Sequence, residues 1–408
     1  MGRKLDLDTG TPVWSAYRAP ADRSAPLQRD AACDVLIVGL GISGAMAAEA
    51  LTAQGLSVIG VDRRGPMRGS TRSTTALVQF EIDEPITSLS GKIGRAKAEQ
   101  AWRRSRLAVT NLQGRIAQLG IRCRLETRSS LYVAGNVLGA GKLWEEAQAR
   151  VAAGLRATYL SASALNEGFG IDRAGAILSD NNLALDPLKL TVGFLREAAR
   201  RKARFYAPVE VTRLVHHASD VVAETREGRR ITAGHVVLAT GYELMDVVAS
   251  DTHSIISTYV IATKPQKSSL WPGAAFVWEA SDPYLYMRAT HDGRVICGGE
   301  DEEFQDEDRR DALIPAKTAR LAKKLKQLFP QLDTEPDFAW AGSFGTTTTG
   351  LPSIGPLPGR PRVFAVQGYG GNGITFSQIA SELVSTAISG GRDTDAALFA
   401  FGREDRSA

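Results

Sequence analysis

The stretch CDVLIVGLGISGAMAAEALTAQGLSVIGVDRR, residues 33–64, carries the pattern that decides the fold. Its apolar run Val35–Val38 is typical of a short, buried parallel strand. Residues 45–54 are small and predict a helix that ends at the following glycine. The residues LSVIGVD, 56–62, form the next predicted strand. A strand, a glycine turn, a helix and a second strand in this order predict a Rossmann-like βαβ unit, and therefore an α/β fold class.

Three glycines, Gly39, Gly41 and Gly44, stand in GxGxxG spacing between the first strand and the helix. The first allows a tight turn, the second lets a pyrophosphate approach the backbone, and the third lets helix and strand pack closely. The helix N-terminus adds free N–H groups and positive dipole charge. Asp62, 23 positions after Gly39, is placed to accept hydrogen bonds from ribose hydroxyls. The unit therefore predicts dinucleotide binding.

NAD and FAD share this fingerprint, so other stretches must distinguish them. GSTRSTTA, residues 69–76, is rich in small and hydroxyl residues whose backbone and side chains suit the edge of a flat ring. VVLATG, residues 236–241, is another predicted buried strand, and its Ala-Thr-Gly ending lets the chain pass close beside a cofactor.

The order and spacing of the motifs resemble those of the FAD-dependent oxidoreductases of the D-amino-acid oxidase family, which includes glycine, sarcosine and γ-glutamylputrescine oxidases. The resemblance runs from about residue 34 to about residue 391 and rests on VGLGISG, GSTRSTTA, DPLKL, VVLATGYE, YLYMRATHDGRVICGGED, GLPSIGP and GYGGNGITFS. It implies a discontinuous, Rossmann-like FAD-binding domain and a second, antiparallel-sheet substrate domain, so that the whole chain is α+β in character.

The resemblance also explains the C-terminal glycine cluster VQGYGGNGITFS, residues 366–377. It implies that this loop and the next helix lie against the flavin, with backbone N–H groups at the pyrimidine side of the ring. A helix N-terminus there would stabilise negative charge on the reduced ring by about 1 kcal/mol. The complete set of cofactor-binding residues that the motifs and the resemblance together imply is Gly39, Gly41, Ile42, Ser43, Gly44, Asp62, Arg63, Gly69, Ser70, Thr71, Thr75, Ala76, Val209, Thr240, Gly241, Gly371, Gly373, Ile374 and Thr375.

The domain boundaries follow from the same order of motifs. We expect an N-terminal arm over residues 1–33, held to the body by Trp14. The predicted FAD-binding domain comprises residues 34–88, 165–248 and 338–408, and the predicted substrate domain comprises residues 89–164 and 249–337. Residues 92–120 show helical periodicity, and the acidic run EDEEFQDEDRRD, residues 300–311, is interpreted as a solvated loop and helix start.

The resemblance implies oxidation of a C–N bond in an amine or amino acid. The α-hydrogen leaves as hydride to flavin N5, water hydrolyses the imine, and O2 or another acceptor reoxidises the flavin. We assign no catalytic acid or base, because a desolvated pocket can itself lower the pKa of an ammonium group. Two alternatives stay open, a flavoprotein subunit that passes electrons to a partner protein or quinone and a non-catalytic flavin-binding protein. The chain has neither a second GxGxxG nor a CxxC pair, which disfavours a pyridine-nucleotide disulfide reductase.

Candidate substrate residues are Tyr259, Tyr286, Arg288 and Gln79. Strand alternation in YLYMR places Tyr284, Tyr286 and Arg288 on one face, where a guanidinium could hold a carboxylate in a forked pair. The alternative interpretation is an aromatic sheet face with an arginine that binds surface carboxylates or stacks on a tyrosine.

The chain departs from sarcosine oxidases at the positions where those enzymes carry cations. Ala76, Gln79 and Thr375 replace the basic residues that bind carboxylate. Residues 295–297, Val-Ile-Cys, replace the segment with the lysine near flavin N5. Sarcosine is therefore not indicated as the substrate, and rapid reaction with oxygen is not implied.

Composition limits the remaining classes of function. The 408 residues include 49 basic and 45 acidic side chains, a balance too even to indicate nucleic acid as a partner. Three scattered cysteines and five histidines without ligand spacing predict no disulfide framework and no metal site. Residues 69–76 contain no Cys or His, so FAD is expected to bind non-covalently. With no signal peptide or long apolar run, we expect a cytoplasmic protein with a small-molecule substrate and no membrane span; the oligomeric state is not indicated.

Overall fold

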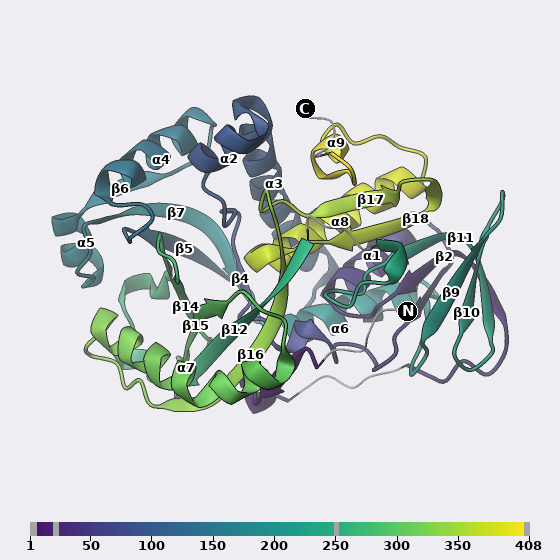
Figure 1. Cartoon of the computed structure of the whole chain (residues 1–408), viewed down its shortest axis with the longest axis horizontal. Coiled ribbons are helices and arrows are strands. Elements are labelled where there is room, and N and C mark those ends of the chain that lie inside the picture. Colours follow the sequence, from purple (N-terminus) through teal and green to yellow (C-terminus); the bar gives the residue numbers. More distant parts are fainter. Residues whose placement is uncertain (1–5, 19–23, 249–252, 404–408) are drawn as a thin grey trace.

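The computed structural model describes residues 6–18, 24–248 and 253–403. Within these ranges the strands form two sheets, one of eight strands and one of ten. Figure 1 shows the sheets side by side, with the eight-stranded sheet on the right. The mixed α/β class expected from the sequence is confirmed.

The eight-stranded sheet contains the predicted βαβ unit. Five of its strands run parallel in the order β18-β11-β2-β3-β8, and an antiparallel strand, β17, forms one edge. A hairpin, β9 and β10, continues from β11. The strands are β2 (Ala31–Val38), β3 (Val58–Val61), β8 (Arg204–Tyr206), β9 (Val211–His216), β10 (Val221–Thr225), β11 (Arg230–Leu238), β17 (Ser353–Leu357) and β18 (Arg360–Gln367).

The centre of this sheet is buried on both faces, as an apolar run without alternation predicts. Val35 and Ile37 of β2 pack into one apolar cluster, which includes residues of helices on that side. Leu36, between them, belongs to a second cluster with Val221 and Ala223 of the hairpin. Both layers hold β2 rigidly, so the turn that follows it has a fixed position.

The ten-stranded sheet is antiparallel except where β13 runs parallel to β5. Its main path is β1-β16-β12-β15-β14-β13-β5-β7-β4, and β6 pairs with β7 beside this path. The strands are β1 (Asp8–Gly10), β4 (Leu77–Val78), β5 (Glu126–Val133), β6 (Thr158–Ser161), β7 (Gly175–Ala184), β12 (His253–Thr263), β13 (Phe276–Glu279), β14 (Leu285–Ala289), β15 (Val295–Glu302) and β16 (Pro336–Thr347).

Helices cover the two sheets from several sides (Figure 1). They are α1 (Ile42–Ala53), α2 (Ile86–Ile93), α3 (Arg95–Leu119), α4 (Ala140–Ala152), α5 (Ala162–Phe169), α6 (Pro187–Arg200), α7 (Glu307–Leu328), α8 (Gly373–Ile388) and α9 (Ala396–Phe399). Helix α1 packs against α6 and α8. The predicted helix over residues 92–120 is divided between α2 and α3, because Gly94 has a φ of 85° that a helix cannot continue.

Part of the N-terminal arm is bound to the body, as expected. Strand β1 pairs with β16, and the buried Trp14 donates a hydrogen bond from Nε1 to the carbonyl oxygen of Thr74 at 2.7 Å. The arm therefore lies against the loop that precedes β4.

The two sheets divide the chain at places that differ from the predicted domain boundaries. Strands β4 and β7 and most of β16 fall in segments assigned to the FAD-binding domain, yet all three pair within the ten-stranded sheet. The division into domains stays a prediction. Among the described residues, no helix combines the length and apolar character that crossing a bilayer requires.

Candidate functional site

A cavity of about 440 Å³ lies between the two sheets and collects motifs from both ends of the chain. Its volume is in the usual range for small-molecule sites. One part is lined by the glycine turn after β2, another by residues 209–214 and the end of β11, and a third by the ten-stranded sheet and the start of α8. Sequence segments more than 300 residues apart thus form a single continuous wall.

The glycine turn brings the start of α1 to the cavity. A Cβ on Gly39, whose φ is 103°, would lie 2.3 Å from the carbonyl oxygen of Ala239. A Cβ on Gly44 would lie 1.9 Å from the carbonyl oxygen of Gly39, so only glycine lets α1 follow β2 this closely. Gly44 does not line the cavity, whereas Gly41, Ile42 and Ser43 do. The positive end of the helix therefore faces the cavity.

Asp62 stabilises this turn from the end of β3. Its Oδ2 accepts a hydrogen bond from the N–H of Leu40 at 2.9 Å, and its Oδ1 accepts from Arg64 at 2.7 Å and Gly65 at 2.9 Å. Burial raises the pKa of Asp62, although these three donors act in the opposite direction. The carboxyl group also lines the cavity, so a contact with a ribose stays a prediction.

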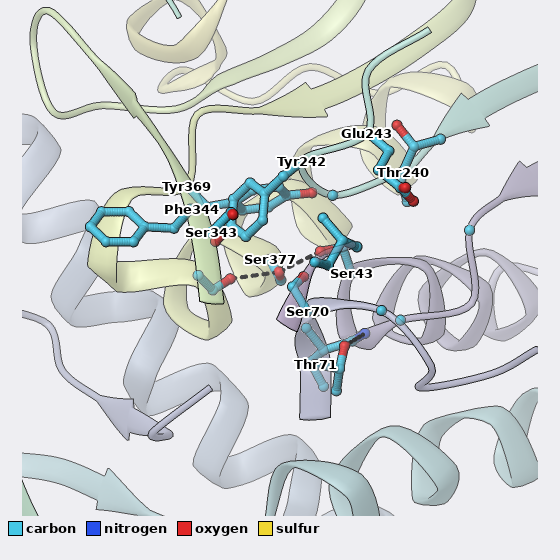
Figure 2. Close-up of a pocket in the computed structure, with 18 of the residues that line it drawn as sticks. Ser43, Ser70, Thr71, Thr240, Tyr242, Glu243, Ser343, Phe344, Tyr369 and Ser377 are labelled. Carbon is cyan, nitrogen blue, oxygen red and sulfur yellow. Dashed lines mark hydrogen bonds between the residues drawn. The ribbon is translucent and has the colours of Figure 1, made fainter. Parts of the chain in front are cut away.

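The predicted loop over residues 69–76 forms the wall next to the glycine turn. Thr71 Oγ1 accepts a hydrogen bond from the N–H of Ile42 at 3.0 Å, which ties the loop to α1. Figure 2 shows Ser70 and Thr71 beside Ser43, with a dashed line from Ser43 to Ser377 of α8. Ala76, the last residue of the loop, is buried behind this wall and does not line it.

The start of α8 forms the wall at the other end. Asn372, its N-cap, donates from Nδ2 to the carbonyl oxygen of Glu81 at 2.8 Å and accepts at Oδ1 from the N–H of Asp83 at 3.2 Å. The N–H of Gly371 donates to Asp83 Oδ2 at 2.8 Å, so this predicted flavin donor already has a partner. Thr375 lies behind the wall and donates from Oγ1 to the carbonyl oxygen of Gln79 at 2.7 Å.

Most predicted cofactor residues are brought together in this cavity. Those that line it are Gly39, Gly41, Ile42, Ser43, Asp62, Arg63, Gly69, Ser70, Thr71, Thr75, Val209, Thr240, Gly241, Gly371, Gly373 and Ile374. Gly44, Ala76 and Thr375 do not line it and support the wall from behind. Arg63 and Arg64 both pair with Glu243 across the end of the cavity formed by Val209.

Two of the predicted substrate residues, Gln79 and Tyr286, also line the cavity, as does Tyr284. The Tyr286 hydroxyl lies 3.5 Å from Thr258 Oγ1, and the rings of Tyr284 and Tyr286 are 5.5 Å apart. Burial raises the pKa of both tyrosine hydroxyls, so both are neutral hydrogen-bonding groups at neutral pH. Both rings line the cavity, and their contact with a substrate stays a prediction.

The placement of Arg288 at the substrate pocket is not supported by the structure, because this side chain is bound elsewhere. Its Nη1 donates to the carbonyl oxygens of Ala76 at 2.6 Å and Leu185 at 3.2 Å, and its guanidinium lies 5.7 Å from the centre of the Trp14 ring. It is 3% exposed and does not line the cavity. Burial lowers the pKa of Arg288 to about 10, so it stays charged at neutral pH and holds the arm and the 69–76 loop together.

The placement of Tyr259 needs the same correction. Its neighbours Thr258 and Val260 line the cavity, and strand alternation turns Tyr259 to the opposite face of β12. There its ring packs in the core beneath α7, with Lys317 Nζ 5.3 Å from the ring centre. Strand alternation alone divides the residues of β12 between two faces, but it does not tell which face meets the cavity.

Several lining residues were not found from the sequence. They are Asp83, Tyr242, Thr258, Val260, Trp278, Ser343, Phe344 and Tyr369. In Figure 2, Tyr242, Phe344 and Tyr369 gather on one side of the cavity, and the rings of Tyr242 and Tyr369 meet edge to face at 6.2 Å. Tyr369 could have been predicted, because it stands between Gly368 and Gly370 inside the C-terminal glycine cluster.

The residues that line the cavity fit FAD in two respects, the exposed backbone of the glycine turn and the polar groups at the aromatic end that lack a partner among the described residues. The close-packed glycine turn leaves backbone where a pyrophosphate must approach. The buried side-chain nitrogens Gln79 Nε2 and Trp278 Nε1 have no hydrogen-bond partner among the described residues and belong to the aromatic end. Unpartnered buried donors are rare in folded proteins and mark a place where a polar ligand is accepted.

Comparison with protein families gives the same cofactor. The family model described as FAD dependent oxidoreductase matches residues 34–387 of this chain. Gamma-glutamylputrescine oxidoreductase of Escherichia coli (strain K12) is 26% identical over 390 residues, which is 92% of this chain and 89% of that protein.

Solved structures share the fold at lower identity. Glycine oxidase from Geobacillus kaustophilus superimposes with a TM-score of 0.74 at 19% identity, over 91% of this chain and 99% of that one. L-proline dehydrogenase from P. horikoshii superimposes with a TM-score of 0.77 at 17% identity, over 93% of this chain and 99% of that one. At these identities the superpositions show a common fold.

Proposed function

The chain belongs to the family of FAD-dependent oxidoreductases, and from this premise we propose that it oxidises a C–N bond of an amine or amino acid with FAD bound in the cavity between the sheets. One observation carries the proposal. The glycine turn before α1 and the glycine cluster before α8 line one cavity, and the antiparallel sheet closes its third side. Such an arrangement holds an elongated dinucleotide at both ends and leaves one face for a substrate.

Different segments of the wall would hold different parts of FAD. The N-terminus of α1 suits the pyrophosphate, and the end of the cavity near Val209 and Arg63 suits the adenosine. The N-terminus of α8 and the loop over residues 69–76 suit the ring system. When bound, FAD supplies a two-electron acceptor for the hydrogen on the carbon next to the substrate nitrogen.

The residues of this chain prepare the substrate for that transfer. Tyr284, Tyr286 and Trp278 present an aromatic wall that excludes water. A substrate ammonium group that this wall desolvates loses its proton more easily, since desolvation lowers its pKa. The neutral amine then releases hydride readily, and water hydrolyses the imine after it leaves the pocket. No residue need act as a dedicated base.

FAD is proposed to bind without a covalent link. None of the described residues that line the cavity is a cysteine or histidine, the side chains that form such links through sulfur or nitrogen. Cys123 and Cys297 are buried away from this lining, and burial raises the pKa of the Cys123 thiol to about 12. Denaturation should therefore release the flavin into solution.

The test combines cofactor analysis with a substrate screen. The purified protein is denatured and its flavin identified, and the native protein is then incubated with single amines and an artificial dye acceptor while carbonyl products are measured. We expect about one FAD per chain and a carbonyl product from one class of amine. A protein that contains no FAD, or whose FAD supports no carbonyl product from any amine, would contradict the proposal.

Replacing the dye by air tells which acceptor operates. Product formation in air at a rate comparable with the dye indicates an oxidase. Product formation with the dye alone indicates a dehydrogenase or a subunit that passes electrons to a partner protein or quinone. Both outcomes are compatible with the proposed oxidation of the amine.

A further inference from the structure

A second cavity, of about 680 Å³, adjoins the aromatic end of the first. The two share Asp83, Trp278, Tyr284 and Phe344 in their walls. The second cavity then continues past the start of α2 and along α4. A substrate whose reacting carbon lies in the first cavity would extend into this space.

The charge of the second cavity is mainly negative. Among the described residues, its lining contains five carboxyl groups and a single cationic side chain, Lys142. Two of these carboxylates are already neutralised, since Glu84 pairs with Lys92 at 2.9 Å and Glu279 pairs with Arg173 at 3.0 Å. The other three are Asp83, Glu145 and Asp301.

Asp301, near the end of β15, differs from the other carboxylates of this cavity. Both of its carboxyl oxygens are buried, their hydrogen-bonding neighbours are the neutral hydroxyl groups of Thr258 and Tyr284, and no cation pairs with them among the described residues. An ionised carboxylate without a cationic partner is costly inside a protein, so such a group favours a bound cation. It lines the second cavity beside Tyr284, at the junction with the first.

The neighbouring residue, Glu300, explains why no lysine among the described residues forms an ion pair with Asp301. Glu300 points to the other face of β15, where it pairs with Lys317 at 3.5 Å, Arg320 at 3.6 Å and also Lys324 of α7. Lys317 in addition binds Glu302 at 2.6 Å and donates to the carbonyl oxygen of Glu300 at 2.8 Å. These three cations of α7 are therefore bound on the side of the strand away from the cavity.

We propose that Asp301 receives a second, positively charged group of the substrate, so that this chain acts on diamines or longer polyamines rather than on simple amino acids. The inference rests on the proposed function and names its substrate class. The ring stack of Tyr132 and Trp278, at 3.8 Å, and the nearby Tyr284 provide aromatic surface that also attracts an organic cation. A carboxylate at the same position would face Asp301 and Asp83, and Arg288 is bound elsewhere.

The test measures binding without turnover. The holoenzyme is reduced chemically under anaerobic conditions, so that it cannot oxidise the probe, and is titrated calorimetrically with three compounds of one chain length. These are 1,4-diaminobutane with two ammonium groups, butylamine with one, and 4-aminobutyrate with a carboxylate at the far end. Wild type should bind the diamine most tightly and 4-aminobutyrate most weakly.

Three variants assign the preference to a residue. Asp301→Asn keeps the shape and removes the charge, and should weaken diamine binding by about 30-fold while leaving butylamine within about threefold. Asp301→Glu keeps the charge and should retain the order of the three probes. Glu145→Gln removes an exposed carboxylate of the same cavity and should change each affinity by less than about threefold.

The outcomes separate the two proposals. The inference is overturned if Asp301→Asn keeps the wild-type ratio of diamine to butylamine affinity, or if wild type binds 4-aminobutyrate as tightly as the diamine. In that case carbonyl production from some other amine would leave the proposed function intact. Selective diamine binding by a holoenzyme that oxidises no amine would support the cation site and contradict the proposed function. FAD content and melting temperature of each variant confirm that it is folded.

Discussion

One methyl group at position 44 is enough to separate α1 from β2. The added Cβ of Gly44→Ala would lie 1.9 Å from the carbonyl oxygen of Gly39, which is backbone and cannot rotate away. We expect this variant to lose about 3 kcal/mol of stability and most of its bound FAD, because the helix must move away from the turn. Thermal unfolding and the ratio of flavin to protein absorbance measure both effects.

The matched control is Gly114→Ala, on the exposed surface of α3. Nothing lies within 4 Å of its added Cβ, so the variant should keep its FAD and gain about 0.5–1 kcal/mol from helix propensity. Full FAD content in Gly44→Ala would show that the close packing at this turn is not required.

At position 288 the expected effect is on stability rather than on substrate binding. Arg288→Met leaves the buried carbonyl oxygens of Ala76 and Leu185 without their donor, which costs about 1–3 kcal/mol for each group. Arg288→Lys should restore part of this loss, since an ammonium group can still donate. The melting temperature of each variant is compared with its affinity for 4-aminobutyrate. A variant with unchanged melting temperature and weakened carboxylate binding would restore the earlier assignment of Arg288 to the substrate pocket.

The carboxyl group of Asp301 makes stability depend on pH. Burial raises its pKa from 3.8 to about 7, and the groups that act on it besides burial include Thr258, Tyr284, Asp83 and Lys317. The folded state thus holds this proton more tightly than the unfolded chain. Its contribution to stability is complete below about pH 4 and declines as the pH rises from about 4 to about 7.

Asp301→Asn removes this decline. In the absence of amine, the variant should melt several degrees above wild type at about pH 8 and close to wild type at about pH 4. Differential scanning calorimetry at the two pH values provides the comparison. An equal difference at both values would mean that Asp301 does not titrate in this range.

At the scale of elements, the start of α8 depends on one side chain. Asn372 joins the helix to the carbonyl oxygen of Glu81 and the N–H of Asp83, and Asp83 in turn accepts from Gly371. Asn372→Ala should therefore release the segment over residues 81–83, cost about 1–3 kcal/mol and raise the dissociation constant for FAD. Asn111→Ala, which removes an exposed bond to Glu382 between α3 and α8, should cost less than about 1 kcal/mol. Equal losses in the two variants would show that the bonds from Asn372 to residues 81–83 contribute no more than an exposed bond to α8.

At the scale of the whole molecule, the βαβ unit and both glycine clusters were predictable because their geometry is local. The faces of the substrate sheet were not. Tyr259 was predicted to line the substrate pocket but packs beneath α7, because the pairing of β12 with β15, with its register shift, decides which residues meet the cavity. Arg288 was misassigned because its partners come from Trp14 and the loop before β4, far away in sequence.

The surroundings of Asp301, which stands in an acidic run, also could not be predicted from the sequence. The prediction of a helix start in residues 300–311 is confirmed by α7, whereas the prediction of a solvated loop is wrong for Glu300 and Asp301. Glu300 and Asp301 are consecutive residues of β15, so strand alternation places their carboxylates on opposite faces. The acidic run itself does not show that Glu300 and Asp301 continue a strand, because this depends on the pairing of β15 with β12 and β14.

The most direct measurement is a single-turnover reaction without oxygen. Oxidised wild-type holoenzyme is mixed with 1,4-diaminobutane in a stopped-flow instrument, the visible flavin absorbance is followed, and the carbonyl product is counted afterwards. We expect the absorbance to bleach at a rate that saturates with diamine concentration, and about one carbonyl to form per bound FAD. Bound FAD that stays oxidised under every amine tested would contradict amine oxidation as the function of this chain.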